Sequence, residues 1–314
     1  MASGREFRFG IMCSHAASAT DFREKARQAE ALGYSTLFVP DHFVDHPLAP
    51  MPAMAAAAAV TDTLRVGSLV LGNDYKHPVV LAREAATLDL LSDGRLELGL
   101  GAGWMTADYE KAGLDLDRAG VRIDRLEESV KIVKGLMGDE PYTFHGAHYT
   151  VTDLDGEPKP VQQPHPPFII GGGAPKILGL AAREAAIVGV NANLRGGVAI
   201  SDDAARSMTG PATDQKMAWL REAAGARFDD LEIQSFVGFT TFTDDRRQLA
   251  EMMAGSFGVT PEEALETPVV LAGTLEEMID DLYARRERWG MSYVVVGVDV
   301  IEQFAPAVAK LAGT

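Results

Sequence analysis

The chain has 314 residues, of which 46% are hydrophobic and 24% are charged. This composition is typical of a globular protein and excludes a disordered or collagen-like chain. The 29 Lys and Arg residues stand against 45 Asp and Glu, and the net charge of −16 disfavours binding to nucleic acid or to an anionic membrane surface. We therefore expect small molecules or further copies of this chain as partners, with no nucleic acid and no membrane.

Cysteine usage and the N-terminal sequence bear on the compartment. Cys13 is the only cysteine, so neither an intrachain disulfide nor a thiolate zinc cluster can form. The first ten residues lack the apolar core of a secretion signal, and no run approaches the ~18 apolar residues that cross a bilayer. The sequence predicts a cytoplasmic protein without a metal site.

Short apolar runs recur along the chain, and a helical pattern follows most of them. Strands that are apolar on both faces are typical of a parallel sheet covered by helices. The predicted strands, in chain order, are Phe7–Cys13, Thr36–Asp41, Leu64–Leu71, Arg95–Leu100, Phe168–Gly171, Ile187–Val190, Ile233–Thr243 and Tyr293–Val298.

Helix start and stop signals support this alternation. Thr260 and Thr274 each begin a T-x-x-E capping box, in which side chains at both ends of the box satisfy backbone N–H groups of the first turn. Gly33 and Gly290 follow apolar stripes at helical spacing, and glycine at this position commonly ends a helix.

Eight such units can close as a (β/α)8 barrel or remain an open, doubly wound sheet. An open dinucleotide-binding sheet would show G-x-G-x-x-G after an early strand, whereas the first strand here runs into Cys13, Ser14 and His15. We therefore predict a single (β/α)8 TIM barrel over residues 1–314, with insertions near residues 138–166, 191–230 and 244–267. The first insertion resembles a β-hairpin, and the other two are candidate substrate-binding loops.

Reactive groups in such a barrel lie at the carboxyl ends of the strands. Asp41 and His42 end the second strand. A histidine here can exchange a proton near neutral pH, and the adjacent carboxylate would fix its tautomer. The alternative is a capping aspartate beside a structural histidine.

Glycines mark two further strand ends. Gly171, Gly172 and Gly173 precede Ala174 and a helix, an arrangement suited to cradling a phosphate with backbone N–H groups, although it can also be a simple turn. Gly101 and Gly103 after the fourth strand could leave room for a planar ring, with tight strand packing as the alternative.

Other common catalytic patterns do not occur. His77 before Pro78 is more typical of a helix start than of a catalyst. The chain contains no H-E-x-x-H, G-x-S-x-G or Walker A sequence, which disfavours the common hydrolase and kinase classes.

Several motifs together carry a family resemblance. Residues 29–34 (AEALGY), the pair Asp41 and His42, residues 77–78 (HP), residues 85–95 (AATLDLLSDGR) and residues 164–173 (PHPPFIIGGG) occur in this order over nearly the full length. With these motifs the chain resembles the luciferase-like monooxygenase superfamily, in its deazaflavin (coenzyme F420)-dependent oxidoreductase branch.

The resemblance implies a barrel with insertions that holds F420, or alternatively FMN, in a homodimer. It places His42 beside the reactive ring, with Asp41 next to it, as the catalytic candidates, and it implies a cis peptide bond within Ser68–Leu71. The implied cofactor-binding residues are Ser68, Leu69, Val70, Gly72, Asn73, Gly101, Gly103, Gly171, Gly172, Gly173, Ala174 and Asn191. The candidate substrate-binding residues are His15, Phe43, Tyr75 and Trp104.

The activity we expect is hydride transfer between reduced deazaflavin and a C=C, C=N or C=O group, or the reverse. Sugar-phosphate dehydrogenases of this branch place a catalytic Glu after the fourth strand, where this chain has Trp104, so a substrate with an apolar or aromatic portion is the hypothesis. The alternatives are an FMN-dependent monooxygenase and a non-catalytic flavin-binding barrel.

Overall fold

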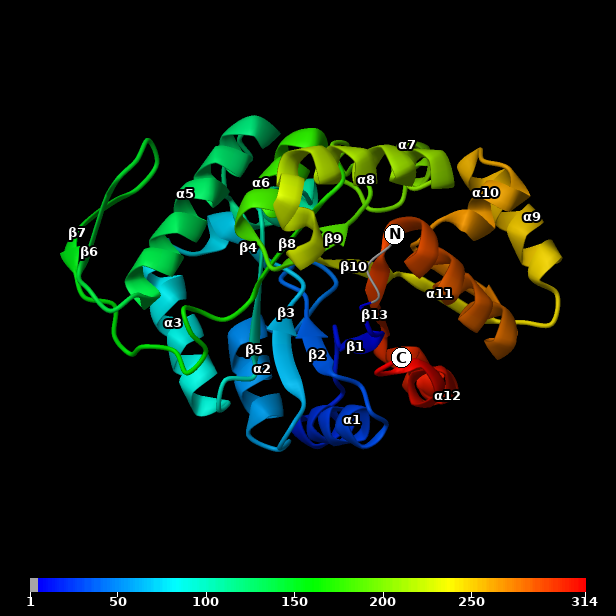
Figure 1. Ribbon diagram of the computed structural model, residues 1–314, viewed down its shortest axis with the longest axis horizontal. Coiled ribbons are helices and arrows are strands. Elements are labelled where there is room, and N and C mark those ends of the chain that lie inside the picture. The colour runs from blue at the N-terminus through cyan, green and yellow to red at the C-terminus, as the bar shows by residue number, and fades with distance from the viewer. Residues whose placement is uncertain (1–4) are drawn as a thin grey trace. The chain divides into compact units, whose positions relative to one another are not determined.

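The computed structural model describes residues 5–314. In it the apolar runs of the sequence form parallel strands, and helices surround these strands (Figure 1). The strands close into a barrel, so the fold belongs to the (β/α)8 class that the sequence predicts. By their internal contacts the residues divide into two units, which are described in turn.

One unit comprises Cys13–Glu30 and Thr36–Ile170. In its part of the barrel β2 pairs with β3, both β3 and β4 pair with β5, and β5 pairs with β8, all in parallel. These strands are β2 (Thr36–Val39), β3 (Arg65–Ser68), β4 (Leu71–Gly72), β5 (Leu96–Gly101) and β8 (Phe168–Gly172), whose last two residues belong to the other unit. The helices are α1 (Ala19–Ala31), whose last residue belongs to the other unit, α2 (Pro50–Ala58), η1 (Asn73–Tyr75), α3 (Pro78–Leu91), α4 (Thr106–Ala112) and α5 (Ala119–Met137).

The other unit contains Ala31–Ser35, Gly171–Thr314 and the described residues before Cys13. Here β13 lies between β1 and β10, and β10 also pairs with β9, again in parallel. The strands are β1 (Arg8–Met12), β9 (Ile187–Val190), β10 (Glu232–Val237) and β13 (Met291–Gly297). The helices are α6 (Pro175–Glu184), α7 (Asp202–Arg206), α8 (Gly210–Ala224), η2 (Gly225–Asp230), α9 (Arg246–Phe257), α10 (Pro261–Glu266), α11 (Leu275–Trp289), η3 (Val298–Val300) and α12 (Ile301–Leu311).

The local signals of the sequence have the expected structural effect. Thr260 and Thr274 form complete capping boxes with Glu263 and Glu277 at the starts of α10 and α11. Residues 293–296 of β13 are buried, as expected for a strand that is covered on both faces. The core of each unit is therefore built from the apolar runs that the sequence displays.

Two predicted strands are interrupted. The third divides into β3 and β4 around a cis peptide bond between Leu69 and Val70, inside the segment where the family resemblance implies one. The seventh ends at Val237, and residues beyond Gly238 form β11 (Phe239–Phe242), which pairs in parallel with β12 (Val270–Gly273) in a separate two-stranded sheet. The sequence did not predict β12, which is only four residues long, or α2.

The three predicted insertions contain regular structure. The first is an antiparallel hairpin of β6 (Tyr142–His145) and β7 (Thr150–Leu154), which extends beyond α5 in Figure 1. The second contains α7, α8 and η2, and the third contains α9 and α10.

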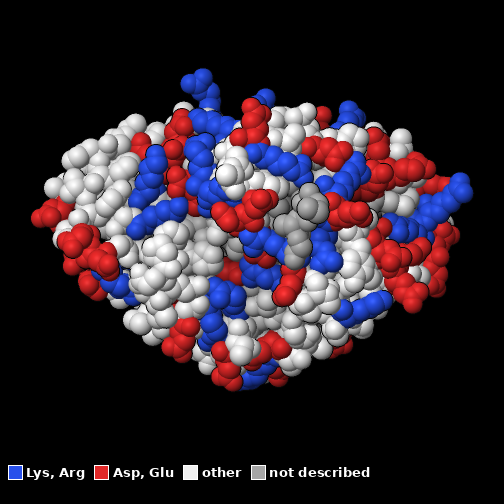
Figure 2. Space-filling model, in the orientation of Figure 1, with Lys and Arg blue, Asp and Glu red and all other residues white. Residues whose placement is uncertain are grey.

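Among the described residues no helix is long and apolar enough to cross a membrane, and no group of three or more His, Cys, Asp or Glu could hold a metal ion. On the face shown in Figure 2, acidic and basic side chains are intermixed.

Candidate functional site

His42 follows β2 and forms a close pair with a carboxylate from a distant part of the sequence. His42 Nδ1 lies 2.6 Å from Asp108 Oδ2, and Asp108 belongs to α4, which follows β5. The other carboxylate oxygen accepts hydrogen bonds from the backbone N–H groups of Phe43 at 2.9 Å and Val44 at 3.0 Å. The Tyr75 hydroxyl donates to Asp108 Oδ2 at 3.2 Å. Asp108 thus fixes both the ring of His42 and the backbone that follows it.

The electrostatics of this pair determine which nitrogen of His42 carries a proton. The Asp108 side chain is fully buried. Burial alone would raise the pKa of Asp108, but the hydrogen bonds from His42, Phe43 and Val44 outweigh burial and hold this pKa below its ordinary value. An ionised carboxylate can only accept, so Nδ1 of His42 is the donor, and Nε2 is the nitrogen that can exchange a proton with a bound molecule.

Asp41 has a different role from the one that the sequence suggested. We expected Asp41 to orient the neighbouring histidine, whereas its Oδ2 accepts a hydrogen bond from the backbone N–H of Gly72 at 3.0 Å. Burial raises the pKa of Asp41. The carboxylate therefore joins the end of β2 to the end of β4, and Asp108 takes the orienting role.

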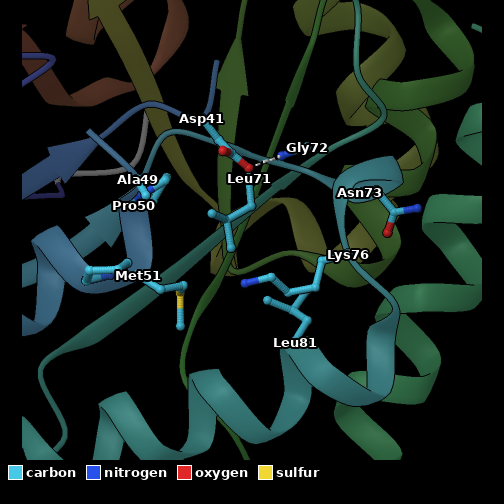
Figure 3. Close-up of a pocket in the computed structure, with 10 residues that line it drawn as sticks. Asp41, Ala49, Pro50, Met51, Leu71, Gly72, Asn73, Lys76 and Leu81 are labelled. Atoms are coloured by element: carbon cyan, nitrogen blue, oxygen red, sulfur yellow. Dashed lines mark hydrogen bonds between the residues drawn. The ribbon is translucent and has the colours of Figure 1, made fainter. Parts of the chain in front are cut away.

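A pocket of about 140 Å³ lies beside Asp41 (Figure 3). Its walls combine apolar side chains of the start of α2 with the segment that follows β3, and Lys76 is the cation among them. Asn73 also lines this pocket and is 2% exposed. Its Nδ2 lies 3.4 Å from the Tyr149 hydroxyl, and its Oδ1 has no hydrogen-bond partner among the described residues. A buried acceptor without a partner is uncommon in a folded protein.

Aromatic rings surround the His42 and Asp108 pair. The Trp104 ring lies edge-on to the His42 ring with 5.4 Å between centroids, and the His46 ring lies 5.1 Å from it. Phe43 and Tyr75 pack with centroids 4.4 Å apart, and Phe43 is 54% exposed. The sequence proposed Phe43, Tyr75 and Trp104 as substrate contacts, and the structure groups all three around His42 or Asp108.

The residue after Asp108 anchors a second loop. The Tyr109 hydroxyl donates to Asp74 Oδ2 at 2.9 Å, and Arg125 of α5 donates to Asp74 Oδ1 at 2.8 Å. Gly103 has a φ of +77°, and a Cβ there would lie 1.9 Å from the Tyr109 hydroxyl. Gly103 is therefore explained by its backbone conformation and by Tyr109.

Packing also explains the glycines of β5. A Cβ on Gly99 would lie 2.0 Å from the carbonyl oxygen of Ser68, and one on Gly101 would lie 2.6 Å from Val70 Cγ2. The Ser68 hydroxyl donates to the Gly99 carbonyl at 2.9 Å and accepts from the Gly99 N–H at 3.0 Å. These contacts correspond to the packing alternative for the glycines after the fourth predicted strand, and they hold Ser68 and Val70 against β5.

In the other unit, the turn from β8 into α6 carries the predicted phosphate cradle. Ala174 is the N-cap of α6 and makes no side-chain hydrogen bond to the helix. The N–H groups of the first turn are therefore without a side-chain cap, as an anion site requires. A Cβ on Gly173 would lie 2.4 Å from the carbonyl oxygens of both Asn191 and Ala192. The Asn191 N–H donates to the Gly172 carbonyl at 3.0 Å, so Asn191 adjoins the cradle.

The remaining predicted contacts are less closely defined. His15 is exposed, and its Nδ1 lies 3.3 Å from the Ser14 hydroxyl. His77 is the N-cap of α3 and accepts a hydrogen bond from the Val79 N–H at 3.3 Å, which confirms its expected structural role.

The sequence did not reveal Asp108, Tyr109 or Asp74. Asp108 lies 66 positions from His42, and no local spacing connects the two. Side chains at the carboxyl ends of barrel strands converge. The position of Asp108, four residues after Trp104 and in a helix at the carboxyl end of a strand, is the signal that could have identified it.

Comparisons with known proteins agree with this fold. An F420-dependent glucose-6-phosphate dehydrogenase of Amycolatopsis mediterranei is 32% identical over 160 residues, which cover 49% of this chain and 48% of that protein. An FMNH2-dependent dimethylsulfone monooxygenase of Pseudomonas putida is 30% identical over 128 residues, 41% of this chain and 35% of that protein. This chain therefore aligns with about half of the dehydrogenase and about a third of the monooxygenase.

The coenzyme F420-dependent tetrahydromethanopterin reductase of Methanopyrus kandleri has the same fold, with a TM-score of 0.77 over 97% of this chain and 96% of that one at 18% identity. The model of the luciferase-like monooxygenase family matches residues 6–293. The chain therefore belongs to the luciferase-like monooxygenase family.

Proposed function

We propose that this protein is an F420-dependent oxidoreductase, which transfers a hydride between reduced deazaflavin and a C=C, C=N or C=O group of an organic substrate, or in the reverse direction. The observation that carries the proposal is the buried contact of 2.6 Å between Asp108 and His42. It leaves one histidine nitrogen to exchange a proton among aromatic side chains. The F420-dependent dehydrogenase at 32% identity supports the choice of cofactor.

Each unit, taken by itself, has a feature that suits a phosphorylated ring cofactor. The first turn of α6 offers backbone N–H groups without a side-chain cap to an anion. Asn73 Oδ1 is a buried acceptor without a partner, which a donor on a bound molecule would satisfy. Gly171, Gly172, Gly173 and Ala174 would hold the phosphate end, and a bound deazaflavin supplies the hydride.

His42 would supply or remove the proton that accompanies hydride transfer. For reduction of a C=O group, the hydride forms the new C–H bond and a doubly protonated His42 gives its Nε2 proton to the oxygen, which leaves the ring neutral. Asp108 stabilises the charged ring before the transfer and keeps Nδ1 protonated throughout. In the oxidative direction a neutral His42 accepts the proton at Nε2.

The side chains near His42 favour a substrate with an apolar or aromatic portion. Phe43 is about half exposed and packs on Tyr75, and Trp104 lies edge-on to His42. Rings at such positions bind apolar groups by burying their surface. Turnover of a sugar phosphate by a protein inactive on apolar carbonyl and alkene compounds would contradict this part of the proposal.

The experiment is a cofactor titration of the purified apoprotein with F420 and with FMN, followed by oxygen consumption with each reduced cofactor. We expect F420 to bind more tightly and its reduced form to be stable in air when bound. Tight binding of FMN with oxygen uptake would instead favour a monooxygenase, the second candidate, which the relative from Pseudomonas putida supports.

A non-catalytic flavin-binding protein is distinguished by His42→Ala. In an enzyme this change lowers turnover and leaves cofactor affinity nearly unchanged, because the histidine acts on the proton. If neither the variant nor the wild type turns over substrate faster than a protein-free control, the protein is a binding protein.

A further inference from the structure

Lys216 of α8 is a buried ammonium group that the proposed mechanism leaves unexplained. It is 3% exposed. Its Nζ donates to the carbonyl oxygens of Asn191 at 2.7 Å and Ser207 at 2.5 Å, and it lies 3.1 Å from the sulfur of Met208. All three neighbours are uncharged, and over residues 5–314 no carboxylate forms an ion pair with Lys216.

A buried ammonium without a carboxylate is energetically unfavourable. Moving a charged group out of water costs several kcal/mol, and proteins usually offset this cost with a paired opposite charge. Carbonyl dipoles solvate Lys216 but leave its charge uncompensated. A negative charge supplied by a bound molecule would compensate it.

The position of Asn191 connects Lys216 to the cradle. The Asn191 carbonyl oxygen lies 2.7 Å from Lys216 Nζ and 2.4 Å from the point where a Gly173 Cβ would lie. By the triangle inequality, Lys216 Nζ is at most 5.1 Å from that point. The charge therefore lies close to the glycine turn.

A positive charge would offset an unfavourable feature of the cradle. The carbonyl oxygens of Asn191 and Ala192 both crowd Gly173, and their negative ends disfavour an anion there. The N-terminal end of the α6 dipole opposes this effect, and the ammonium at Asn191 opposes it further. At an effective dielectric constant near 20, a charge at ~6 Å contributes an amount comparable to a tenfold or larger change in affinity.

We propose that Lys216 is a positioning residue for the phosphate end of the cofactor: it fixes the Asn191 backbone against Gly173 and provides the buried positive charge for an anion held by Gly171, Gly172, Gly173 and Ala174. This inference rests on the proposed function, because it concerns the same cofactor. It assigns the charge of the site to a side chain on α8, outside the glycine motif.

The test compares ligands that differ in the phosphate. F420 is compared with FO, the deazaflavin that lacks the phosphate and the groups beyond it, and FMN is compared with riboflavin. Affinities are measured by fluorescence titration for the wild type and for Lys216→Met. We expect the variant to lose affinity for the phosphorylated ligand about tenfold or more, and to change its affinity for the phosphate-free ligand less than threefold.

Arg285 of α11 provides the matched control. It is a second buried cation, 5% exposed, and it donates to the carbonyl oxygens of Pro268 and Val270, away from the glycine turn in sequence. Arg285→Met also removes a buried charge, so it has a comparable effect on folding. We expect it to leave the preference for F420 over FO unchanged.

A measurement on the wild type covers the case in which Lys216→Met does not fold. Burial lowers the pKa of Lys216 to about 8, and its neighbours Asn191, Ser207 and Met208 do not titrate in this range. As pH rises through about 8, Lys216 loses its charge while the phosphodiester of F420 keeps its own. The ratio of F420 affinity to FO affinity should therefore fall over this range. A ratio constant from pH 6.5 to 9.5 overturns the proposal.

The outcomes separate the two proposals. A wild type that binds none of the four ligands overturns both. A wild type that prefers F420 over FO, with the same preference in Lys216→Met, overturns only the assignment of Lys216. Equal losses for F420 and FO in the variant would reveal a purely structural lysine and also overturn the assignment.

Discussion

The segment after β2 and the turn after β8 hold their functional groups in contrasting ways. After β2, the carboxylate of Asp108 binds the ring of His42 and two backbone N–H groups. After β8, glycines and an uncapped helix start leave backbone N–H groups available, and no side-chain cap contributes. A site fixed by a distant side chain depends on that one residue, whereas a backbone site depends on the space around its glycines.

Removal of Asp108 is the largest expected effect and the most direct way to break this contrast. Asp108→Ala leaves His42 and two backbone N–H groups without their buried acceptor, so we expect a loss of about 3–5 kcal/mol in the free energy of unfolding. Denaturant titration measures the loss. A change below about 1 kcal/mol would mean that the pair is not a structural anchor.

Asp108→Asn separates charge from shape at the same position. The amide oxygen can still accept from Phe43 and Val44, but a neutral amide no longer stabilises a charged His42 ring. We expect turnover to fall about 100-fold or more, in the range of general acid–base catalysis, with a smaller loss of stability than for Asp108→Ala. Nitrogen NMR of the His42 ring, which reports the protonated nitrogen, is the check beside kinetics.

Gly103→Ala tests how strictly the anchor of the second loop is packed. The new Cβ would meet the Tyr109 hydroxyl at 1.9 Å in a backbone conformation with φ of +77°, so we expect a loss of about 3 kcal/mol in unfolding free energy. Gly113→Ala is the matched control, because its φ is +70° and nothing lies within 4 Å of the new Cβ; it should cost about 1 kcal/mol. Equal losses of unfolding free energy for the two variants would show that the clash with the Tyr109 hydroxyl does not contribute.

Gly173→Ala applies the same test to the backbone site. Its Cβ would lie 2.4 Å from two carbonyl oxygens, so we expect a loss of about 2 kcal/mol in stability, together with weaker binding of phosphorylated cofactor. Gly179, within α6, has only the guanidinium of Arg183 nearby, at 3.6 Å. Gly179→Ala should therefore stabilise the protein by about 0.5–1 kcal/mol. Thermal unfolding of both variants gives the comparison, and a tolerated Gly173→Ala would show that the turn can move.

Glu30 is a carboxylate that anchors backbone N–H groups outside the site, and it extends the comparison. Its Oε1 accepts from the N–H groups of Asp62, Thr63 and Leu64. Burial raises the pKa of Glu30, but these hydrogen bonds outweigh it and lower the pKa from 4.5 to about 2. The folded state therefore gains stability that is complete above pH 4.5 and is lost as pH falls towards 2.

Glu30→Gln should cost about 1–2 kcal/mol at neutral pH, an amount discounted for partial exposure. The difference from the wild type should shrink as pH falls from 4.5, which acid titration of unfolding free energy measures. A difference that grows in acid would contradict the assignment.

The sequence predicted most of the barrel because each strand is a local apolar run. It did not predict β12, which lies outside the barrel in a two-stranded sheet with β11, and it merged β3 with β4 because the apolar run continues through Leu69 and Val70. The sequence could nominate site residues only where one segment contains them, as at Asp41, His42 and Gly171, and it gave Asp41 the contact with His42 that Asp108 makes in the structure. Asp108 lies 66 positions from His42, and Lys216 lies 25 positions from Asn191, so only the tertiary fold brings these pairs together.

Asp108 holds position 43 through a main-chain N–H group, so the side chain at this position is not part of the anchor. Phe43 can therefore be replaced by other residues while the orientation of His42 is retained. In the proposed enzyme, a library for directed evolution that varies Phe43 and keeps Asp108, Tyr109 and Gly103 constant would change which molecules are accepted while the contact between His42 and Asp108 is retained. The same separation gives gene duplicates of this scaffold a route to new substrates that costs little stability.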